Sequence, residues 1–313
     1  MDKQSARLIE KRPLSSDTLD FCFELSDGEL RGVAPGAHVD ICLPEGLVRQ
    51  YSLWDWADCG RRFRVAVKLE AQGRGGSRAM HLLEEGALVE VRGPRNNFPL
   101  QPGTNRKTLL AGGIGATPIY AMAQHLAARK ADFQVFYVVR TRERAAFDEF
   151  FRALPAGFSY HLHCTEAEGP FDLAALVSSV PPGGDLYACG PRSMLDALQE
   201  LSPLLRGGRL HFERFVASAT EPAAGGEFEI ELESSGAVYR VGPGQSVLEV
   251  LRNQAIHLDF GCTEGLCGSC MIEVVSGEVD HRDSILSPEE RASNDVMCAC
   301  VSRAKSQRLV LRL

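Results

Sequence analysis

The chain contains no run of about eighteen apolar residues, the length from which a membrane-spanning helix is read. It also lacks an excess of basic side chains, because its formal net charge is −7 at pH 7. Nucleic acid and anionic membranes both require a basic surface, so neither is expected as a partner. The first residues, MDKQ, lead into charged positions without the apolar stretch of a secretion signal. We therefore expect a cytoplasmic protein that does not contact a membrane.

Outside residues 217–226, repeats and low-complexity segments are also absent, and the eight histidines show no metal-ligand spacing. The chain does have 313 residues, of which 44% are hydrophobic. That is enough to bury a substantial core, and the length suggests two or three domains. The sequence has 10 cysteines. Because the cytosol is reducing, a tight group of them indicates metal ligation rather than disulfides.

Such a group occurs in the stretch CTEGLCGSC, which contains Cys262, Cys267 and Cys270. The C-x4-C-x2-C spacing, with a distant fourth cysteine, is the plant-type pattern of a [2Fe–2S] cluster. Zinc sites usually use C-x2-C pairs instead. Cys298 and Cys300 are both candidates for the fourth ligand. A strand predicted through residues 295–301 would point both side chains to one face, so periodicity leaves the choice open.

The segment 227–313 resembles a plant-type ferredoxin domain with a β-grasp fold. A predicted hairpin at 228–241 and a helix capped by Ser246 precede the cysteine loop in the order that this fold requires. In that family the last ligand directly precedes a small apolar residue, as Cys300 precedes Val301. The resemblance therefore implies that Cys298 is a buried neighbour. It assigns the cluster to Cys262, Cys267, Cys270 and Cys300.

A second motif, Arg49-Gln50-Tyr51-Ser52-Leu53, follows a predicted barrel strand at 36–43. It resembles the R-x-Y-S flavin motif of the ferredoxin–NADP reductase superfamily. A tyrosine ring can pack on the flavin, an arginine can bind its phosphate, and a serine hydroxyl can reach the flavin ring. Alternatively, these residues belong to an ordinary strand with an exposed charge.

A glycine-rich loop, residues 73–77, lies between an alternating strand at 63–69 and a predicted helix. Glycines beside a helix start can bind an anion, although such loops also form plain hairpin turns. Together the two motifs resemble the flavin domain of the phthalate dioxygenase reductase family, whose cofactor is FMN; FAD is the alternative. The resemblance implies a flavin site made of Arg49, Tyr51, Ser52, Leu53, Lys68, Gly75, Gly76, Ser77 and Phe215.

Residues 102–216 alternate between predicted strands and helices, which indicates a parallel α/β sheet. The turn GGIGATP, residues 112–118, joins a strand to a helix, with Pro118 in place of the third glycine of G-x-G-x-x-G. Cys189-Gly190-Pro191 follows a later strand, where the cysteine could also be a small buried thiol. The pair resembles the pyridine-nucleotide domain of the same superfamily. It implies an NAD site made of Gly112, Gly113, Gly115, Thr117, Pro118, Arg140, Cys189, Gly190 and Pro191.

Arg140 and Arg142 follow the second strand of this domain, where an arginine can hold a 2′-phosphate. They could equally be solvated loop charges. Since the phthalate-type relatives use NADH, we expect NADH, with NADPH as the alternative. Phe215 resembles the aromatic residue that covers the flavin ring in this family, or it is simply the last core residue of the domain.

Residues 217–226 contain proline and glycine but no large apolar residue, as expected of a flexible tether. We therefore expect an antiparallel β-barrel that binds flavin (1–101), an α/β NAD-binding domain (102–216), a linker (217–226) and a [2Fe–2S] ferredoxin domain (227–313).

This order of domains resembles the phthalate dioxygenase reductase family over essentially the whole chain. The resemblance implies a monomeric oxidoreductase that passes electrons from NADH through FMN and the cluster to a terminal Rieske-type oxygenase, an aromatic-ring dioxygenase or an O-demethylase. The hydride step requires no side chain as acid or base. Alternatives are a reductase for another monooxygenase or a cytochrome P450, and a redox-sensing ferredoxin-domain protein. We expect the oxygenase to dock electrostatically on acidic side chains of the last domain: Glu264, Glu278, Asp280 and Asp283.

Overall fold

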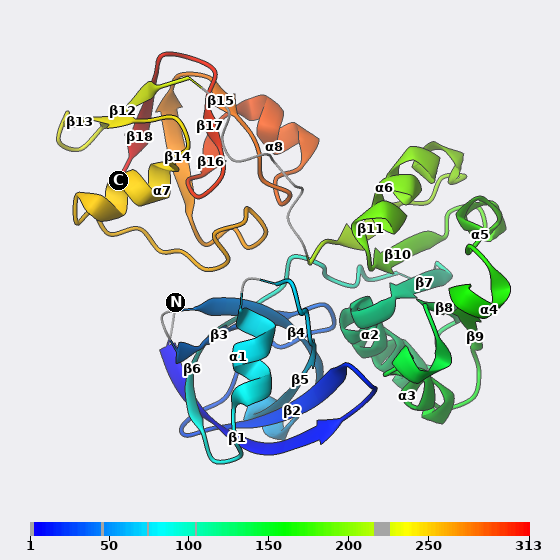
Figure 1. The fold of residues 1–313 in the computed structure, drawn as a ribbon. Helices are drawn as coiled ribbons and strands as arrows, with labels where there is room; N and C mark the ends of the chain where they lie inside the picture. Colours follow the sequence, from blue (N-terminus) through cyan, green and yellow to red (C-terminus); the bar gives the residue numbers. More distant parts are fainter. Residues whose placement is uncertain (1–2, 45–46, 74, 104, 216–225) are drawn as a thin grey trace. The chain divides into compact units, whose positions relative to one another are not determined.

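The computed structural model describes residues 3–44, 47–73, 75–103, 105–215 and 226–313 (Figure 1). Two compact units make up the chain, Met1–Arg214 and Phe215–Leu313. The predicted linker lies outside the described residues except for Gly226. Within the described ranges, no helix is both long and apolar enough to cross a bilayer.

The first unit begins with an antiparallel barrel that closes in the order β1-β2-β5-β4-β3-β6. Its interior is filled by alternate residues of each strand, such as Phe21 and Phe23, and by Met80 of helix α1 (Gly76–Leu82). The predicted strands at 36–43 and 63–69 are β3 and β5. The barrel strands are β1 (Lys3–Pro13), β2 (Thr18–Leu25), β3 (His38–Cys42), β4 (Val48–Ala57), β5 (Arg62–Lys68) and β6 (Leu88–Arg95).

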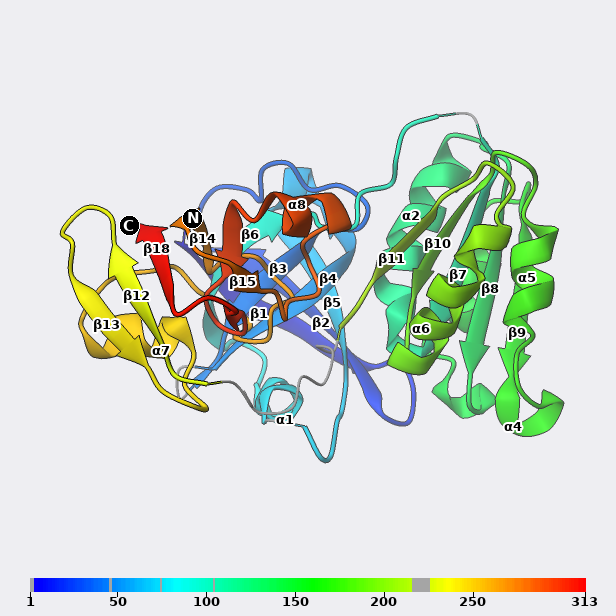
Figure 2. The ribbon, with the colours of Figure 1, turned by 90° about the horizontal axis from the view of Figure 1, so that it is seen from above.

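The same unit continues as a five-stranded parallel sheet in the order β11-β10-β7-β8-β9. Figure 2 shows α2 on one face of this sheet and α5 and α6 on the other. The central strand β7 is buried at every position, as expected of a strand covered on both faces. The elements are β7 (Lys107–Gly112), α2 (Ala116–Ala128), β8 (Phe133–Val139), α3 (Asp148–Ala153), β9 (Ser159–Cys164), α4 (Thr165–Glu168), α5 (Leu173–Ser179), β10 (Asp185–Cys189), α6 (Arg192–Leu201) and β11 (Leu210–Glu213).

The second unit has a mixed sheet in the order β13-β12-β18-β14-β16, with β15 and β17 paired separately. The predicted hairpin is β12 and β13, and the Ser246 side chain caps α7 in a capping box with Glu249. Its elements are β12 (Phe228–Leu232), β13 (Val238–Val241), α7 (Val247–Asn253), β14 (Met271–Ser276), β15 (Val279–Asp280), α8 (Pro288–Ser293), β16 (Val296–Cys298), β17 (Arg303–Ala304) and β18 (Arg308–Arg312).

One predicted strand is shorter than expected. Strand β16 ends at Cys298, and Cys300 lies in the turn that follows it. The amides of Val301 and Ser302 both donate to the carbonyl oxygen of Cys298, which turns the chain at this point. The argument that alternation places Cys298 and Cys300 on one face was therefore wrong, because the alternation stops between them.

Candidate functional site

The loop between α7 and β14 buries three of the predicted cluster ligands: Cys262, Cys267 and Cys270. The loop turns at Gly265 and Gly268, each with a φ of +69°, a conformation that glycine adopts without strain. At Gly265 a Cβ atom would lie 2.7 Å from Cγ2 of Val301. The loop is thus packed closely against the residue that follows Cys300.

Backbone amides of the loop point at the sulfur atoms. The N–H groups of Glu264 and Leu266 both donate to Sγ of Cys262, with N···S distances of 3.3 Å. The N–H groups of Cys262 and Ser269 donate to Sγ of Cys267 at 3.4 Å. Because such hydrogen bonds favour the charged form of a thiol, they suit thiolates that bind iron.

The structure also gathers the later cysteines around the loop. Hydrogen bonds from the thiols of Cys298 and Cys300 lower the pKa of Cys270 and raise their own. The charge of Cys262 and the backbone N–H of Gly265 act on Cys300, whereas the charge of Asp283 acts on Cys298. Buried sulfurs that converge beside backbone donors fit a [2Fe–2S] cluster. Cys300 interacts with Cys262 and Gly265 as well as with Cys270, and its role as fourth ligand stays a prediction.

The two flavin motifs meet in the barrel. Strand β4 carries Arg49, and α1 begins at Gly76 after Gly75, whose φ is +82°. A Cβ atom at Gly76 would overlap the Arg49 side chain, so the arginine lies across the start of α1. A guanidinium held over a glycine-lined turn is a suitable site for the phosphate of a flavin. Arg74 lies outside the described residues.

The other predicted flavin residues differ from one another in burial and in their contacts. Burial raises the pKa of Tyr51, and Ser52 is buried beside it. Leu53 is 0% exposed in the barrel core, so its side chain does not face a ligand. Glu70 engages the remaining two side chains: its N–H donates to Oγ of Ser77 at 3.0 Å, and its carboxylate lies 2.7 Å from Nζ of Lys68. Phe215 is the first residue of the second unit, and its role over the flavin stays a prediction.

The predicted nucleotide loops pack against one another at the carboxyl end of the parallel sheet. A Cβ atom at Gly112 would lie 2.6 Å from Cδ of Pro191, and one at Gly115 would overlap the carbonyl of Cys189. Pro118 lies in the first turn of α2, as predicted. Thr117 is buried there, and its hydroxyl donates to the carbonyl oxygen of Ile114 at 3.1 Å.

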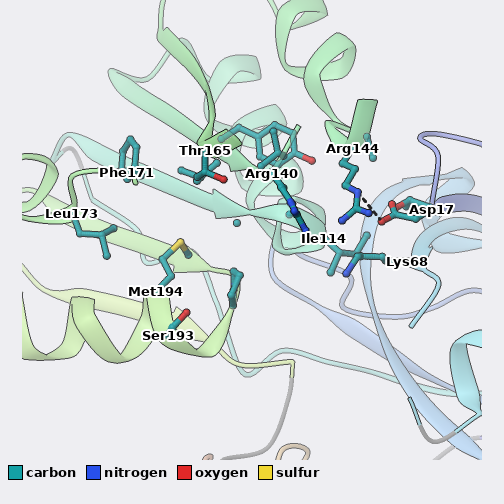
Figure 3. Close-up of a pocket in the computed structure, with 18 residues that line it drawn as sticks. Asp17, Lys68, Ile114, Arg140, Arg144, Thr165, Phe171, Leu173, Ser193 and Met194 are labelled. Atoms are coloured by element: carbon teal, nitrogen blue, oxygen red, sulfur yellow. Dashed lines mark hydrogen bonds and ion pairs between the residues drawn. The ribbon is translucent and has the colours of Figure 1, made fainter. Parts of the chain in front are cut away.

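A cavity of about 450 Å³ opens at this edge (Figure 3). Arg140 and Lys68 line it, whereas Cys189, only 1% exposed, does not. The other predicted residues in its lining are Gly112, Gly113 and Pro191; Gly115, Thr117, Pro118 and Gly190 are outside it. Sequence reasoning missed several residues of this lining, most of which follow the carboxyl ends of strands, where ligands bind such sheets. The missed residues are Asp17, Thr18, Arg144, Thr165, Phe171, Ser193 and Met194.

Each arginine that lines this cavity forms a loose ion pair. Nη2 of Arg140 is 3.9 Å from Oε1 of Glu166. Nε of Arg144 is 3.8 Å from Oδ2 of Asp17, a pair that Figure 3 marks. The hydroxyls of Ser15 and Thr18 donate to Oδ1 of Asp17 at 3.1 and 3.0 Å, which fixes this carboxylate. The turn before β2 therefore places a negative charge at this cavity.

Arg142 does not share this cavity. It lines a separate one of about 440 Å³ together with Arg12 and Asp148, and its guanidinium is 3.9 Å from the Asp148 carboxylate. With a side chain that is 70% exposed, Arg142 fits the alternative of a solvated loop charge. Arg144, at the other end of the short 3-10 helix Arg142–Arg144, lines the first cavity instead.

The predicted docking carboxylates also differ from one another. Asp283 is buried and exposes only 4% of its surface, so its assignment to an exposed docking surface was wrong. Glu278 is exposed and pairs with Lys305 at 3.0 Å, and Asp280 pairs with Arg282 at 2.7 Å. Two of these four carboxylates are thus partly neutralised within the chain itself.

Comparisons with known proteins agree with this architecture. The family described as "2Fe-2S iron-sulfur cluster binding domain" matches residues 230–305, and "Oxidoreductase FAD-binding domain" matches residues 5–99. A vanillate O-demethylase oxidoreductase from Pseudomonas sp. (strain HR199 / DSM 7063) is 41% identical over 96% of this chain and 97% of its own length. A putative toluene-4-sulfonate monooxygenase system reductase subunit from Comamonas testosteroni is 40% identical over 96% of both chains.

Solved structures match over nearly the whole chain. Phthalate dioxygenase reductase superposes with a TM-score of 0.73 and 32% identity, covering 99% of this chain and 97% of its own. An intact type IV self-sufficient cytochrome P450 monooxygenase gives a TM-score of 0.88 and 34% identity over 99% of this chain. The present chain spans only 41% of that longer protein. The predicted fold class is confirmed: an antiparallel barrel, a parallel α/β sheet and a ferredoxin-type domain.

Proposed function

The chain belongs to the phthalate dioxygenase reductase family of electron-transfer oxidoreductases, and from this membership we propose that it is the NADH-dependent, FMN-containing reductase component of a Rieske-type oxygenase. The observation that carries the proposal is the convergence of buried cysteine sulfurs in one unit, in a chain whose other unit has a nucleotide cavity at the edge of a parallel sheet. When bound, flavin accepts electrons in pairs and releases them singly to a cluster.

The proposal keeps the domain boundaries predicted from the sequence: residues 1–101 for flavin, 102–216 for NAD, 217–226 as linker and 227–313 for the cluster. The residues of the chain position and enclose the cofactors. Arg49 and the Gly75–Ser77 turn hold the flavin phosphate, and the packed Gly112–Gly115 and Cys189–Pro191 loops support the nucleotide. Cys262, Cys267, Cys270 and Cys300 bind the cluster.

FMN is proposed over FAD because the resemblance to the phthalate dioxygenase reductase family favours the smaller flavin, and Arg49 lies across Gly76, where it can bind a flavin phosphate. Flavin released by acid should run as FMN on chromatography. Arg49→Gln should lower flavin occupancy at least about tenfold, since a charged donor to phosphate is lost. Full occupancy by FAD in the wild-type chain would contradict this assignment.

NADH is proposed over NADPH because Glu166 and Asp17 place carboxylates beside the two arginines of the cavity. A 2′-phosphate would have to displace these ion pairs and would face like charge. The diphosphate of NADH does not have to displace the Arg140–Glu166 ion pair.

An oxygenase is proposed as the partner because similar full-length proteins are named as reductases of a demethylase and a monooxygenase system. Reduction of a cytochrome P450 is a second candidate, favoured by the likeness to a self-sufficient P450. We further propose that the protein acts as a cytoplasmic monomer.

The decisive experiment is anaerobic reduction of the full chain by NADH, followed at flavin and cluster wavelengths, with a Rieske-type oxygenase and a cytochrome P450 offered as separate acceptors. Both chromophores should bleach, and the oxygenase should be reduced faster. Cys262→Ser should keep flavin reduction but lose electron delivery. A wild-type chain that NADH does not bleach would refute the proposed function, and preferential reduction of the P450 would favour the second candidate.

A further inference from the structure

Residues 280–286 connect β15 to the segment before α8 and contact the cysteine loop. The N–H of Ser284 donates to the carbonyl oxygen of Gly265 at 2.9 Å. A Cβ atom at Gly265 would lie 2.9 Å from Cα of Asp283. The loop that carries Cys262 and Cys267 therefore rests directly on the backbone of Asp283.

The Asp283 side chain is fully buried and fixed in direction. Its Oδ1 atom accepts hydrogen bonds from the N–H groups of Ile285 and Leu286 at 3.1 and 2.8 Å. Its Oδ2 atom has no hydrogen-bond partner among the residues that the structure describes. A buried carboxylate with one oxygen that accepts no hydrogen bond costs folding free energy, because its charge is poorly solvated. Its presence therefore calls for a functional explanation.

Two side chains flank this carboxylate. Nδ1 of His281 lies 3.8 Å from Oδ2 of Asp283, and both ring nitrogens are buried without a partner in the described part of the chain. Burial lowers the pKa of His281, against the opposing pull of Asp283 and Asp280. A neutral ring does not cancel the charge of the carboxylate. Nη2 of Arg291 donates to the backbone carbonyl of Asp283 at 2.6 Å and is 3.7 Å from Oδ1.

The charge of Asp283 acts on the sulfur of Cys298, which itself interacts with the predicted ligands Cys270 and Cys300. It contributes to the raised pKa of Cys298, after the hydrogen bond to Cys270 and burial. In a buried region of low dielectric constant, a charge interacts over several ångströms far more strongly than it would in water. Asp283 therefore places a charge beside Cys298 and beside the loop that its backbone supports.

We propose that Asp283 is a positioning residue that supports the cysteine loop and lowers the reduction potential of the cluster through a fixed negative charge. This rests on the proposed [2Fe–2S] site. Cluster potentials depend on net charge, hydrogen bonds to sulfur and solvent exposure, and an adjacent carboxylate disfavours an added electron. Arg291 acts in the opposite direction, because its positive charge offsets part of the charge of the carboxylate.

The test is a potentiometric titration of the reduced-cluster EPR signal in the full chain. Asp283→Asn keeps an oxygen for the two backbone donors but removes the charge. At a fixed solution potential, the ratio of reduced to oxidised cluster should rise about tenfold, which is about 59 mV for one electron. The matched control is Asp280→Asn, because Asp280 is 33% exposed and already paired with Arg282. Its ratio should change less than about twofold.

Arg291→Gln supplies a second measurement with the opposite sign, since it removes the cation and should lower the ratio. It decides the matter if Asp283→Asn fails to assemble a cluster. Shifts of opposite sign in the two variants support the inference. The inference is overturned if the ratio of reduced to oxidised cluster is unchanged in both variants, or if both variants shift it in the same direction. It is also overturned if Arg291→Gln by itself leaves the ratio unchanged or raises it. A wild-type chain without a [2Fe–2S] signal would instead refute the proposed function.

Discussion

Nδ1 of His38 lies 3.9 Å from Oε1 of Glu213, where barrel strand β3 meets the end of β11. Their side chains are 4% and 13% exposed, and neither Nε2 of His38 nor Oε2 of Glu213 has a partner among the described residues. Burial raises the pKa of Glu213 to about 8 and lowers that of His38 to about 4. Both groups are therefore neutral near pH 6, as a site that excludes water requires.

The first prediction concerns the pH dependence of stability through Glu213. Its pKa in the folded state is about 8, above the ordinary 4.5. The folded state therefore binds more protons than the unfolded one between these values. This contribution is fully present below about pH 4.5 and is lost as the pH rises through 8. Glu213→Gln, which stays neutral, should gain stability relative to wild type as the pH rises from about 5 to about 9.

The measurement is the difference in melting temperature between Glu213→Gln and wild type across that pH range. The variant should gain several degrees, because about 1 kcal/mol shifts the melting temperature of a domain of this size by roughly 2–4 °C. Glu149→Gln is the control, since Glu149 is exposed. A difference that does not vary with pH would show that Glu213 is ionised in the folded protein.

The second prediction concerns the fourth ligand. Cys300→Ser should abolish the EPR signal of a reduced [2Fe–2S] centre, whereas Cys298→Ser should keep it. The physical reason is that Cys300 lies beyond the end of β16 and interacts with Cys262 and Gly265 of the loop. Flavin reduction by NADH should survive in both variants. The reverse pattern, with the signal lost only in Cys298→Ser, would reassign the ligand.

The third prediction concerns nucleotide preference. The kcat/KM for NADH should exceed that for NADPH at least about tenfold, or about 1.4 kcal/mol. Glu166→Gln should narrow this ratio because it frees Arg140 for a 2′-phosphate. Calorimetry with ADP and 2′,5′-ADP separates binding from catalysis. The control is Arg142→Ala, which lines the other cavity and should change neither affinity. If ADP and 2′,5′-ADP bind with equal affinity to the wild type, and also with equal affinity to Glu166→Gln, then Glu166 does not set the nucleotide preference.

The cysteine spacing and the glycine turns could be read from the sequence because their geometry is local. Gly112–Gly115 must turn tightly wherever the strand ends, and Cys262–Cys270 lie in one loop. By contrast, Asp17 reaches the cavity that Arg140 lines only because the barrel packs on the sheet. Asp283 reads as exposed in the polar stretch DHRD, but its carboxylate satisfies two backbone amides and is buried. Such placements depend on tertiary contacts that no local pattern encodes.

The fourth prediction concerns Arg303, which is buried and has no carboxylate within 4 Å among the residues that the structure describes. Its guanidinium donates to the carbonyl oxygens of Gln245, Gly226 and Gly242 at 2.5, 3.0 and 3.2 Å, and it lies 5.0 Å over the Phe228 ring. Arg303→Lys should destabilise the second unit by about 3 kcal/mol, because an ammonium cannot span three acceptors in this fork geometry.

Loss of visible circular dichroism from the cluster in urea would report this change in the full chain. The matched control is Arg308→Lys, which removes exposed contacts to Glu229 and Glu231 and should cost less than about 1 kcal/mol. Equal effects of the two substitutions would mean that the buried carbonyl contacts of Arg303 add nothing to stability.

The last prediction concerns electron delivery to the partner. With Asp283 buried, the acidic docking surface reduces to Glu264, Glu278 and Asp280, and two of these are paired with Lys305 and Arg282. Electron transfer to the oxygenase should still slow as salt rises from about 50 to about 500 mM, because the Debye length falls well below 10 Å. The effect should be modest, since paired carboxylates attract a basic partner less than free ones do. Lys305→Gln, which frees Glu278, should therefore steepen the salt dependence, while flavin reduction by NADH should stay unchanged. Stopped-flow traces at flavin and cluster wavelengths resolve both steps. If the rate of electron transfer to the oxygenase does not depend on salt in either the wild type or Lys305→Gln, docking depends on apolar contact and shape.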